Sequence, residues 1–198
     1  MTVFPPIFLV FLPIAYLIGS IPTGVIAGRI FGGVDPREGG SRNIGATNVG
    51  RTAGKAAGII TLIGDVLKGV LPTYAVWHFW HDPLLLSLVA LFAFLGHIFS
   101  VFLRFRGGKG VATALGVYLV VSPIAALCSL TVFVAALLIR RYVSLGSIIA
   151  AALFPVFLTF IPGSGVYVPL GITMGVIIIV KHSDNIKRLV AGTENKLW

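Results

Sequence analysis

Long apolar runs, separated by short segments rich in cations and glycine, constrain the fold of this chain more than any other feature. Most of them approach the roughly 20 residues that a helix needs to cross a bilayer. Hydrophobic residues fill 57% of the 198 positions and charged residues 11%, whereas a soluble domain carries about 25% charged residues. The sequence therefore predicts an all-α integral membrane protein that forms a single domain over residues 1–198.

The breaks between the runs predict where the helices lie. Proline, glycine and charged residues end or kink helices. We expect spans over residues 3–31, 56–80, 84–103, 144–160 and 166–180. Residues 111–139 are a longer run, and one helix over these roughly 29 residues would measure about 43 Å, against a hydrocarbon layer of about 30 Å. A break at Ser122-Pro123 would give two short helices instead.

The cations decide between one helix and two in this run. With a break at Ser122-Pro123, every Lys and Arg except Lys68 lies on or beside one face of the membrane. The positive-inside rule then predicts seven transmembrane helices, with the N-terminus outside and the C-terminus cytoplasmic. The polar motif loops of this multi-pass cell membrane protein would face the cytoplasm. We expect the net charge of +9 to meet anionic lipid headgroups and not nucleic acid.

Residues 103–113, LRFRGGKGVAT, are typical of an anion-binding loop. Glycine lets backbone N–H groups approach a phosphate, Lys109 offers a positive charge, and the helix that starts near Val111 points its positive end at the same place. The spacing excludes a nucleotide P-loop, which needs Ser or Thr where this chain has Gly110. We expect Arg104 and Arg106 to act as ordinary topology anchors.

Three other polar segments would share that face. Residues 39–51, GGSRNIGATNVGR, combine hydroxyl, amide and guanidinium groups that can bind phosphate. Residues 140–147 present Ser144 and Ser147 where a helix begins, either as helix caps or as ligand contacts. Residues 181–194 place His182 and Asn185 at the mouth of the last span, although this segment could also lie on anionic lipid.

Asp65 and Lys68 lie inside the second span at i, i+3 spacing, and we expect them to neutralise each other in the interior of the bundle. A transport role for the pair remains open. His97 is expected to be packed and hydrogen-bonded. The four histidines and six acids are dispersed, so we expect neither a metal nor a cofactor.

Three motifs in order, SRNIGATNVGR, GGKGVAT and HSDNIKRLVAGTE, together with RRYVSLGS, resemble the PlsY family of bacterial acyltransferases. The resemblance covers nearly the whole chain. It implies transfer of a fatty acyl group from acyl phosphate to the sn-1 hydroxyl of glycerol 3-phosphate, giving lysophosphatidate and phosphate, the first acylation step of phospholipid synthesis. It also implies an enzyme that acts beside membrane lipid, and we expect it to be metal-independent and to function as a monomer.

The resemblance also supplies site residues by position. We expect the catalytic residues to be Lys109, His182 and Arg51. The expected substrate contacts are Ser41, Asn43, Gly45, Thr47, Asn48, Gly107, Gly108, Gly110, Ser147, Asn185 and Glu194. Arg42 departs from the glycine often found at its place, so no role is assigned to it.

Elementary chemistry agrees with this assignment. An acyl phosphate is already activated, so the enzyme mainly has to hold two polyanions together and stabilise the developing charge. The sequence contains no Gly-x-Ser-x-Gly elbow. We expect direct attack without an acyl-enzyme, with His182, Glu194 or a substrate phosphate oxygen accepting the proton. The competing hypothesis is a transporter or flippase of an anionic solute, suggested by Asp65 and Lys68.

Overall fold

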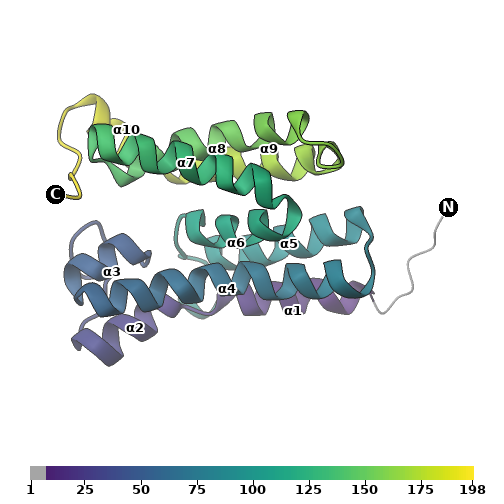
Figure 1. Ribbon diagram of the computed structural model, residues 1–198. Helices are drawn as coiled ribbons and strands as arrows, with labels where there is room; N and C mark the ends of the chain where they lie inside the picture. Colours follow the sequence, from purple (N-terminus) through teal and green to yellow (C-terminus); the bar gives the residue numbers. More distant parts are fainter. Residues whose placement is uncertain (1–7) are drawn as a thin grey trace. The chain divides into compact units, whose positions relative to one another are not determined.

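The computed structural model describes residues 8–198, which fold into α-helices and short 3-10 helices, with no strand among them. Contacts divide the chain into two compact units, Met1–Val120 and Val121–Trp198, and each is described by itself (Figure 1). The expectation of a single domain stays a prediction. Residues 3–7 of the expected first span lie outside the described residues.

The first unit is built around α4, the longest helix described. Its elements are α1 (Phe8–Ser20), α2 (Thr23–Gly32), α3 (Ala46–Thr52), α4 (Lys55–Phe79), α5 (Pro83–Ile98), η1 (Val101–Leu103) and α6 (Val111–Val121), the last ending at the boundary between the units. Helix α1 packs along α5, and α4 contacts α2, α3 and α5. The loop between α2 and α3 and the turn between α5 and α6 carry the polar motifs.

Glycines let helices of this unit approach each other closely. A Cβ on Gly19 of α1 would lie 1.9 Å from the carbonyl oxygen of Ala93 on α5. A Cβ on Gly69 of α4 would lie 2.3 Å from the carbonyl oxygen of Thr113 on α6. Small residues at such crossings are the usual way in which membrane helices gain packing contacts. The two crossings fix the helices from which the polar turn leaves and to which it returns.

The second unit packs α8 against both α7 and α9. Its elements are α7 (Pro123–Arg140), α8 (Val143–Phe160), η2 (Gly165–Tyr167), α9 (Val168–Lys181) and α10 (Ser183–Val190). Helices α9 and α10 are bent by 57° relative to each other, with His182 at the bend.

Proline places the helix breaks as the sequence predicts. Helix α6 ends at Val121 and α7 begins with Pro123, which confirms the expected break in the run over residues 111–139. Proline suits the first helical position because its missing N–H would have no partner there. A second break, at Ile21-Pro22, divides the expected first span into α1 and α2.

Five segments of the described chain are long and apolar enough to cross a membrane. They are Val10–Gly32, Lys55–Phe79, Pro83–Leu103, Pro123–Arg140 and Val143–Phe160. The bent pair over residues 165–190 makes a sixth if it counts as one span. Helix α6 is apolar but only 11 residues long, so the predicted count of seven spans stays a prediction.

Candidate active site

The side chain of Asn48 organises the loop between α2 and α3. Its Oδ1 accepts a hydrogen bond from the Ser41 N–H at 2.8 Å, and its Nδ2 lies 2.8 Å from the Pro36 carbonyl oxygen and 2.9 Å from that of Asn43. The residue is only 2% exposed. A carboxamide suits this place because it both donates and accepts. Asn48, predicted to contact substrate, thus uses its amide to shape the loop.

The other predicted residues of this loop lie around the start of α3. Gly45 is the N-cap of α3 with extended backbone, Asn43 and Thr47 are half-buried, and Ser41 and Arg51 are exposed. The structure therefore brings these five residues onto one short stretch held by Asn48. Their contacts with substrate stay a prediction.

The glycines of the turn between α5 and α6 pack against the end of α5. Gly107 N–H donates to the carbonyl of Ile98 and Gly108 N–H to that of His97, both at 3.1 Å. A Cβ on Gly108 would lie 2.2 Å from Nε2 of His97. These two N–H groups therefore satisfy the last carbonyls of α5, and the predicted contacts of Gly107 and Gly108 with substrate stay a prediction.

Gly110 and Lys109 complete this turn. Gly110 has φ +83°, a conformation that favours glycine, and a Cβ there would lie 2.3 Å from Cε2 of Phe94. Lys109 is half-buried between the two packed glycines. Gly108 and Gly110, on either side of Lys109, both pack closely against α5. This packing fixes the backbone position of the predicted catalytic lysine.

A cavity of about 790 Å³ lies between the two polar segments of the first unit. Its lining is mostly charged and comes from both segments: Asp35, Arg37, Glu38, Arg42, Ile44, Phe102, Leu103, Arg104, Arg106 and Gly107. Ile44 and Leu103 also belong to a buried apolar cluster with Val25 of α2. The two segments are therefore joined by a small core beside the cavity.

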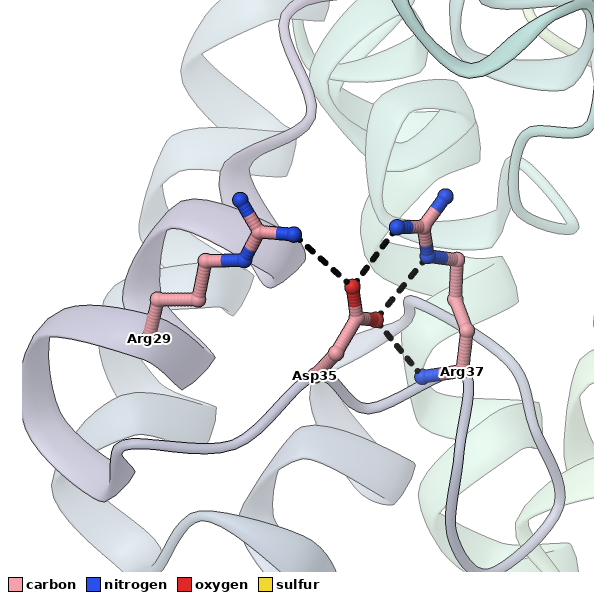
Figure 2. Close-up of polar contacts among 3 residues, drawn as sticks. All are labelled: Arg29, Asp35 and Arg37. Carbon is pink, nitrogen blue, oxygen red and sulfur yellow. Dashed lines mark hydrogen bonds and ion pairs between the residues drawn. The ribbon is translucent and has the colours of Figure 1, made fainter.

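Asp35 at the cavity wall is neutralised by two arginines. Its carboxylate accepts from the Arg37 side chain at 2.6 and 2.9 Å and from Arg29 at 3.3 Å, so that it lies between the two guanidinium groups (Figure 2). The hydrogen bonds from Arg37 hold the pKa of Asp35 well below its ordinary value, and the same bonds raise the pKa of Arg37. Asp35 stays ionised, but its charge is already compensated.

The predicted pairing of Asp65 with Lys68 is confirmed. Lys68 Nζ lies 2.8 Å from Asp65 Oδ1, and both side chains are 3% exposed. The Thr23 hydroxyl donates to Asp65, and Lys68 donates to the Ile21 carbonyl at 3.1 Å. His97 Nδ1 lies 3.6 Å from the same carboxylate. These contacts attach the break between α1 and α2 to α4, which explains the pair without a transport role.

In the second unit the carboxylate of Glu194 is the centre of the polar contacts. It accepts hydrogen bonds from Ser144 Oγ at 2.7 Å, Asn185 Nδ2 at 2.6 Å and Arg188 Nε at 2.7 Å. Burial raises the pKa of Glu194, but the three hydrogen bonds outweigh burial and leave the pKa below its ordinary value. Glu194 is thus an ionised acceptor that joins α8, α10 and the C-terminal segment.

Ser147 and His182 take positions that correct part of the sequence interpretation. Neither Ser144 nor Ser147 caps α8, because Tyr142 is the N-cap and no side-chain cap bond forms. Ser147 Oγ donates to the Val143 carbonyl within the helix at 2.9 Å. His182 is 3% exposed, and its Nδ1 lies 2.8 Å from the Ile178 carbonyl. Since a carbonyl only accepts, Nδ1 is the donor of this bond, and in the neutral tautomer the basic nitrogen is Nε2.

The structure therefore assembles two clusters, one in each unit. Sequence reasoning missed the acidic and aromatic members of the cavity, and it interpreted Arg104 and Arg106 as topology anchors although they line it. The alternating charges of Asp35-Pro36-Arg37 were the available signal. Among residues 8–198 no group of three or more His, Cys, Asp or Glu residues could hold a metal ion.

Comparison with known proteins gives concordant matches over almost the full length. The model of the family described as glycerol-3-phosphate acyltransferase matches residues 9–192. The glycerol-3-phosphate acyltransferase of Trichlorobacter lovleyi is 51% identical over 182 residues, which cover 92% of this chain and 93% of that protein. That of Geobacter sulfurreducens is 49% identical over 188 residues, covering 95% and 96%.

Solved structures agree with the sequence matches. The crystal structure of PlsY, an integral membrane glycerol 3-phosphate acyltransferase, in its glycerol 3-phosphate form has a TM-score of 0.90 and 43% identity, covering 96% of this chain and 94% of that chain. The lysophosphatidic acid form has a TM-score of 0.86 and 41% identity over the same shares.

Proposed function

Because this chain belongs to the glycerol-3-phosphate acyltransferase family, as an all-helical, multi-pass integral membrane protein of the PlsY type, we propose that it acylates glycerol 3-phosphate with acyl phosphate as the donor. The products are lysophosphatidate and inorganic phosphate. The observation that carries the proposal is the full-length similarity to a PlsY structure determined both in a glycerol 3-phosphate form and in a lysophosphatidic acid form. The two units would then form one acyltransferase domain that acts as a monomer.

The proposed reaction is a direct acyl transfer. The 1-hydroxyl oxygen of glycerol 3-phosphate attacks the carbonyl carbon of the acyl phosphate, the bond from that carbon to the phosphate oxygen breaks, and phosphate leaves with the bonding electrons. Lys109 and Arg51 stabilise the anionic transition state, which is the main task when the donor is already activated. No covalent acyl-enzyme and no metal ion take part.

The geometry of the second unit narrows the choice of proton acceptor. The pKa of Glu194 is lowered and its carboxylate already accepts three hydrogen bonds, so it is a poor base. His182 has its proton on Nδ1, which leaves Nε2 as the basic nitrogen. We therefore assign the attacking hydroxyl's proton to His182 Nε2 or to a phosphate oxygen of the substrate, and give Glu194 a positioning role.

The remaining predicted residues take supporting roles. Ser41, Asn43 and Thr47 contact the substrates from the loop before and within α3, and Asn185 does so from α10. Gly45, Gly107, Gly108 and Gly110 allow the backbone geometry of the loops, Asn48 shapes the first loop, and Ser147 lies in the first turns of α8.

We also propose that the chain crosses the membrane seven times, with α1 and α2 as one span, followed by α4, α5, α6, α7, α8 and α9. The support is the distribution of cations, which fall on or beside one set of turns. The N-terminus is then outside, and the active site faces the cytoplasm. In a Cys128→Ser background, an impermeant maleimide should label His81→Cys in intact cells and Phe105→Cys only in inside-out membrane vesicles. Labelling of both from one side would overturn this topology.

The decisive assay uses purified protein in detergent with palmitoyl phosphate and glycerol 3-phosphate, without added metal. Release of phosphate and formation of lysophosphatidate are expected. Activity with acyl-CoA or acyl carrier protein, but none with acyl phosphate, would overturn the donor assignment. A labelled acyl group bound covalently to the protein would overturn direct transfer.

A further inference from the structure

Three arginines of the cavity have no part in the proposed reaction. Arg42, Arg104 and Arg106 line the cavity, and none of them forms an ion pair with a carboxylate in the described part of the chain. Arg37 is committed to Asp35 at 2.6 Å. Apart from the pair of Asp35 and Arg37, the lining thus contains three arginines and one acidic residue, Glu38. The cavity therefore carries a surplus of positive charge.

The backbone beneath these arginines is fixed. Ile44, two residues after Arg42, and Leu103, next to Arg104, are 4% and 7% exposed and pack in one cluster with Val25. Arginine carries about 2 kcal/mol of rotamer entropy, so anchoring its backbone removes part of the cost of ordering it around a ligand. Arginines scattered on a mobile loop would pay the full entropic cost of becoming ordered around a ligand.

Arg42 and Arg104 also occupy backbone conformations that disfavour them. Their φ angles are +57° and +52°, in the left-handed region where a Cβ is unfavourable and glycine is preferred. Neighbouring Phe105 has φ +62°. Strained residues of this kind gather at ligand-binding sites, where the surrounding structure holds them. Here the chain places arginine, and not glycine, at two left-handed positions of one cavity.

We propose that Arg42, Arg104 and Arg106 form a subsite for a phosphate monoester dianion, separate from the position of Lys109. Guanidinium groups bind phosphate oxygens through paired N–H donors. Gly107 lines the same cavity, so the subsite is continuous with the turn that carries Lys109. The soluble source of such a dianion is glycerol 3-phosphate, which rests on the proposed function, and the lipid source is the headgroup of lysophosphatidate or phosphatidate.

The left-handed backbone provides a test that avoids misfolding. The double variant Arg42→Gly/Arg104→Gly removes two charges and also relieves the disfavoured φ angles. The matched control is Arg141→Gly, which changes an exposed arginine with φ +62° at the end of α7, in the other unit. Arg42→Lys/Arg104→Lys keeps the charge and the strain, and it should recover most of what the glycine variant loses.

Binding of radiolabelled glycerol 3-phosphate in nonionic detergent is measured by equilibrium dialysis, in a Lys109→Ala background that removes the lysine contact. The double glycine variant should bind about tenfold or more weakly than its parent, and the difference should shrink in high salt. In the active background, KM for glycerol 3-phosphate should rise by a similar factor, with a smaller change in kcat. The Arg141→Gly control should match its parent in both measurements.

A second arm tests the lipid source with short-chain phosphatidate in mixed micelles, whose ³¹P signal broadens on binding. Broadening that depends on Arg42 and Arg104, with unchanged glycerol 3-phosphate binding, assigns the subsite to a headgroup. If neither probe distinguishes the double variant from its parent and from the Arg141→Gly control, the subsite is refuted. Arginine-dependent binding, together with no acyl transfer by the wild-type protein, would refute the proposed function and leave the subsite standing.

Discussion

Asn48 in the first unit and Glu194 in the second each gather a polar segment around one largely buried side chain, but with different chemistry. The partners of Asn48 are backbone groups of residues 36–43, whereas those of Glu194 are the side chains of Ser144, Asn185 and Arg188. An amide donates and accepts, so it fits a loop of mixed backbone groups. An ionised carboxylate only accepts, so it selects donors.

The difference shows how each segment can serve an anionic substrate. Asn48 holds the first loop without adding negative charge next to a cavity lined by arginines. Glu194 does add a charge, but Arg188 at 2.7 Å compensates for it. The first loop is thus organised by Asn48, which carries no charge. The C-terminal segment is organised by Glu194, whose effect depends on pH and on its partner Arg188.

The largest expected effect comes from Glu194→Ala. It leaves the donors of Ser144, Asn185 and Arg188 without their common acceptor, which we expect to lower the free energy of unfolding by about 3 kcal/mol and activity more than tenfold. Thermal unfolding in detergent and phosphate release measure the two effects. Glu194→Gln, which keeps one acceptor oxygen, should fall between; a wild-type melting temperature for Glu194→Ala would remove this residue from the centre of the network.

Asn48→Asp should follow in size, with a loss of about 2 kcal/mol. Asp keeps an acceptor for the Ser41 N–H but places a carboxylate against the carbonyls of Pro36 and Asn43, which leaves buried acceptors unpaired. Melting temperatures compare it with Asn43→Ala, whose backbone carbonyl survives the substitution. Equal melting temperatures for the two variants would mean that the Asn48 amide does not hold the loop.

Lowering the pH should weaken the contacts of Glu194 but not those of Asn48. The folded-state pKa of Glu194 is lowered, so the stability it contributes is complete above its unfolded pKa and disappears as the pH falls through the folded value. Asn48 does not titrate. Between about pH 5 and 3 the melting temperature of the wild type should therefore fall more steeply than that of Glu194→Gln. Parallel curves for the two proteins would contradict this reading; Asp35 titrates with the same sign in both, so it cancels in the difference.

The smallest expected effect compares two serines of α8. Ser144→Ala removes a hydrogen bond to the Glu194 carboxylate and should cost about 1 kcal/mol. Ser147→Ala removes only a bond to a carbonyl of its own helix and should cost less than about 0.5 kcal/mol. Chemical denaturation of the two variants side by side measures the difference, and a reversed order would show that the network around Glu194 does not extend to α8.

The sequence predicted the features that depend on local chemistry. Pro123 located a helix break because proline removes a backbone donor and clashes with the preceding turn. The i, i+3 spacing of Asp65 and Lys68 predicted their pairing because an isolated charge inside a bundle is too costly. Both inferences need only neighbouring residues and the solvent.

Features that depend on distant residues could not be predicted in the same way. Ser144 and Glu194 are 50 positions apart, and nothing in either segment indicates the other. Arg104 and Arg106 fitted a topology anchor as well as a cavity wall, because an arginine near a membrane face serves both. The glycines beside Lys109 fitted a phosphate cradle, and only the neighbouring α5 shows that two of them end a helix.

That last feature changes what variation among related sequences can reveal. A Cβ at Gly107 would lie 2.0 Å from the His97 carbonyl oxygen, and one at Gly108 would meet the His97 ring. Selection would retain glycine at both positions even in a descendant that had lost every ligand. An invariant glycine here reports the packing of α5, so evolutionary evidence for the chemistry of this turn has to come from the position of Lys109.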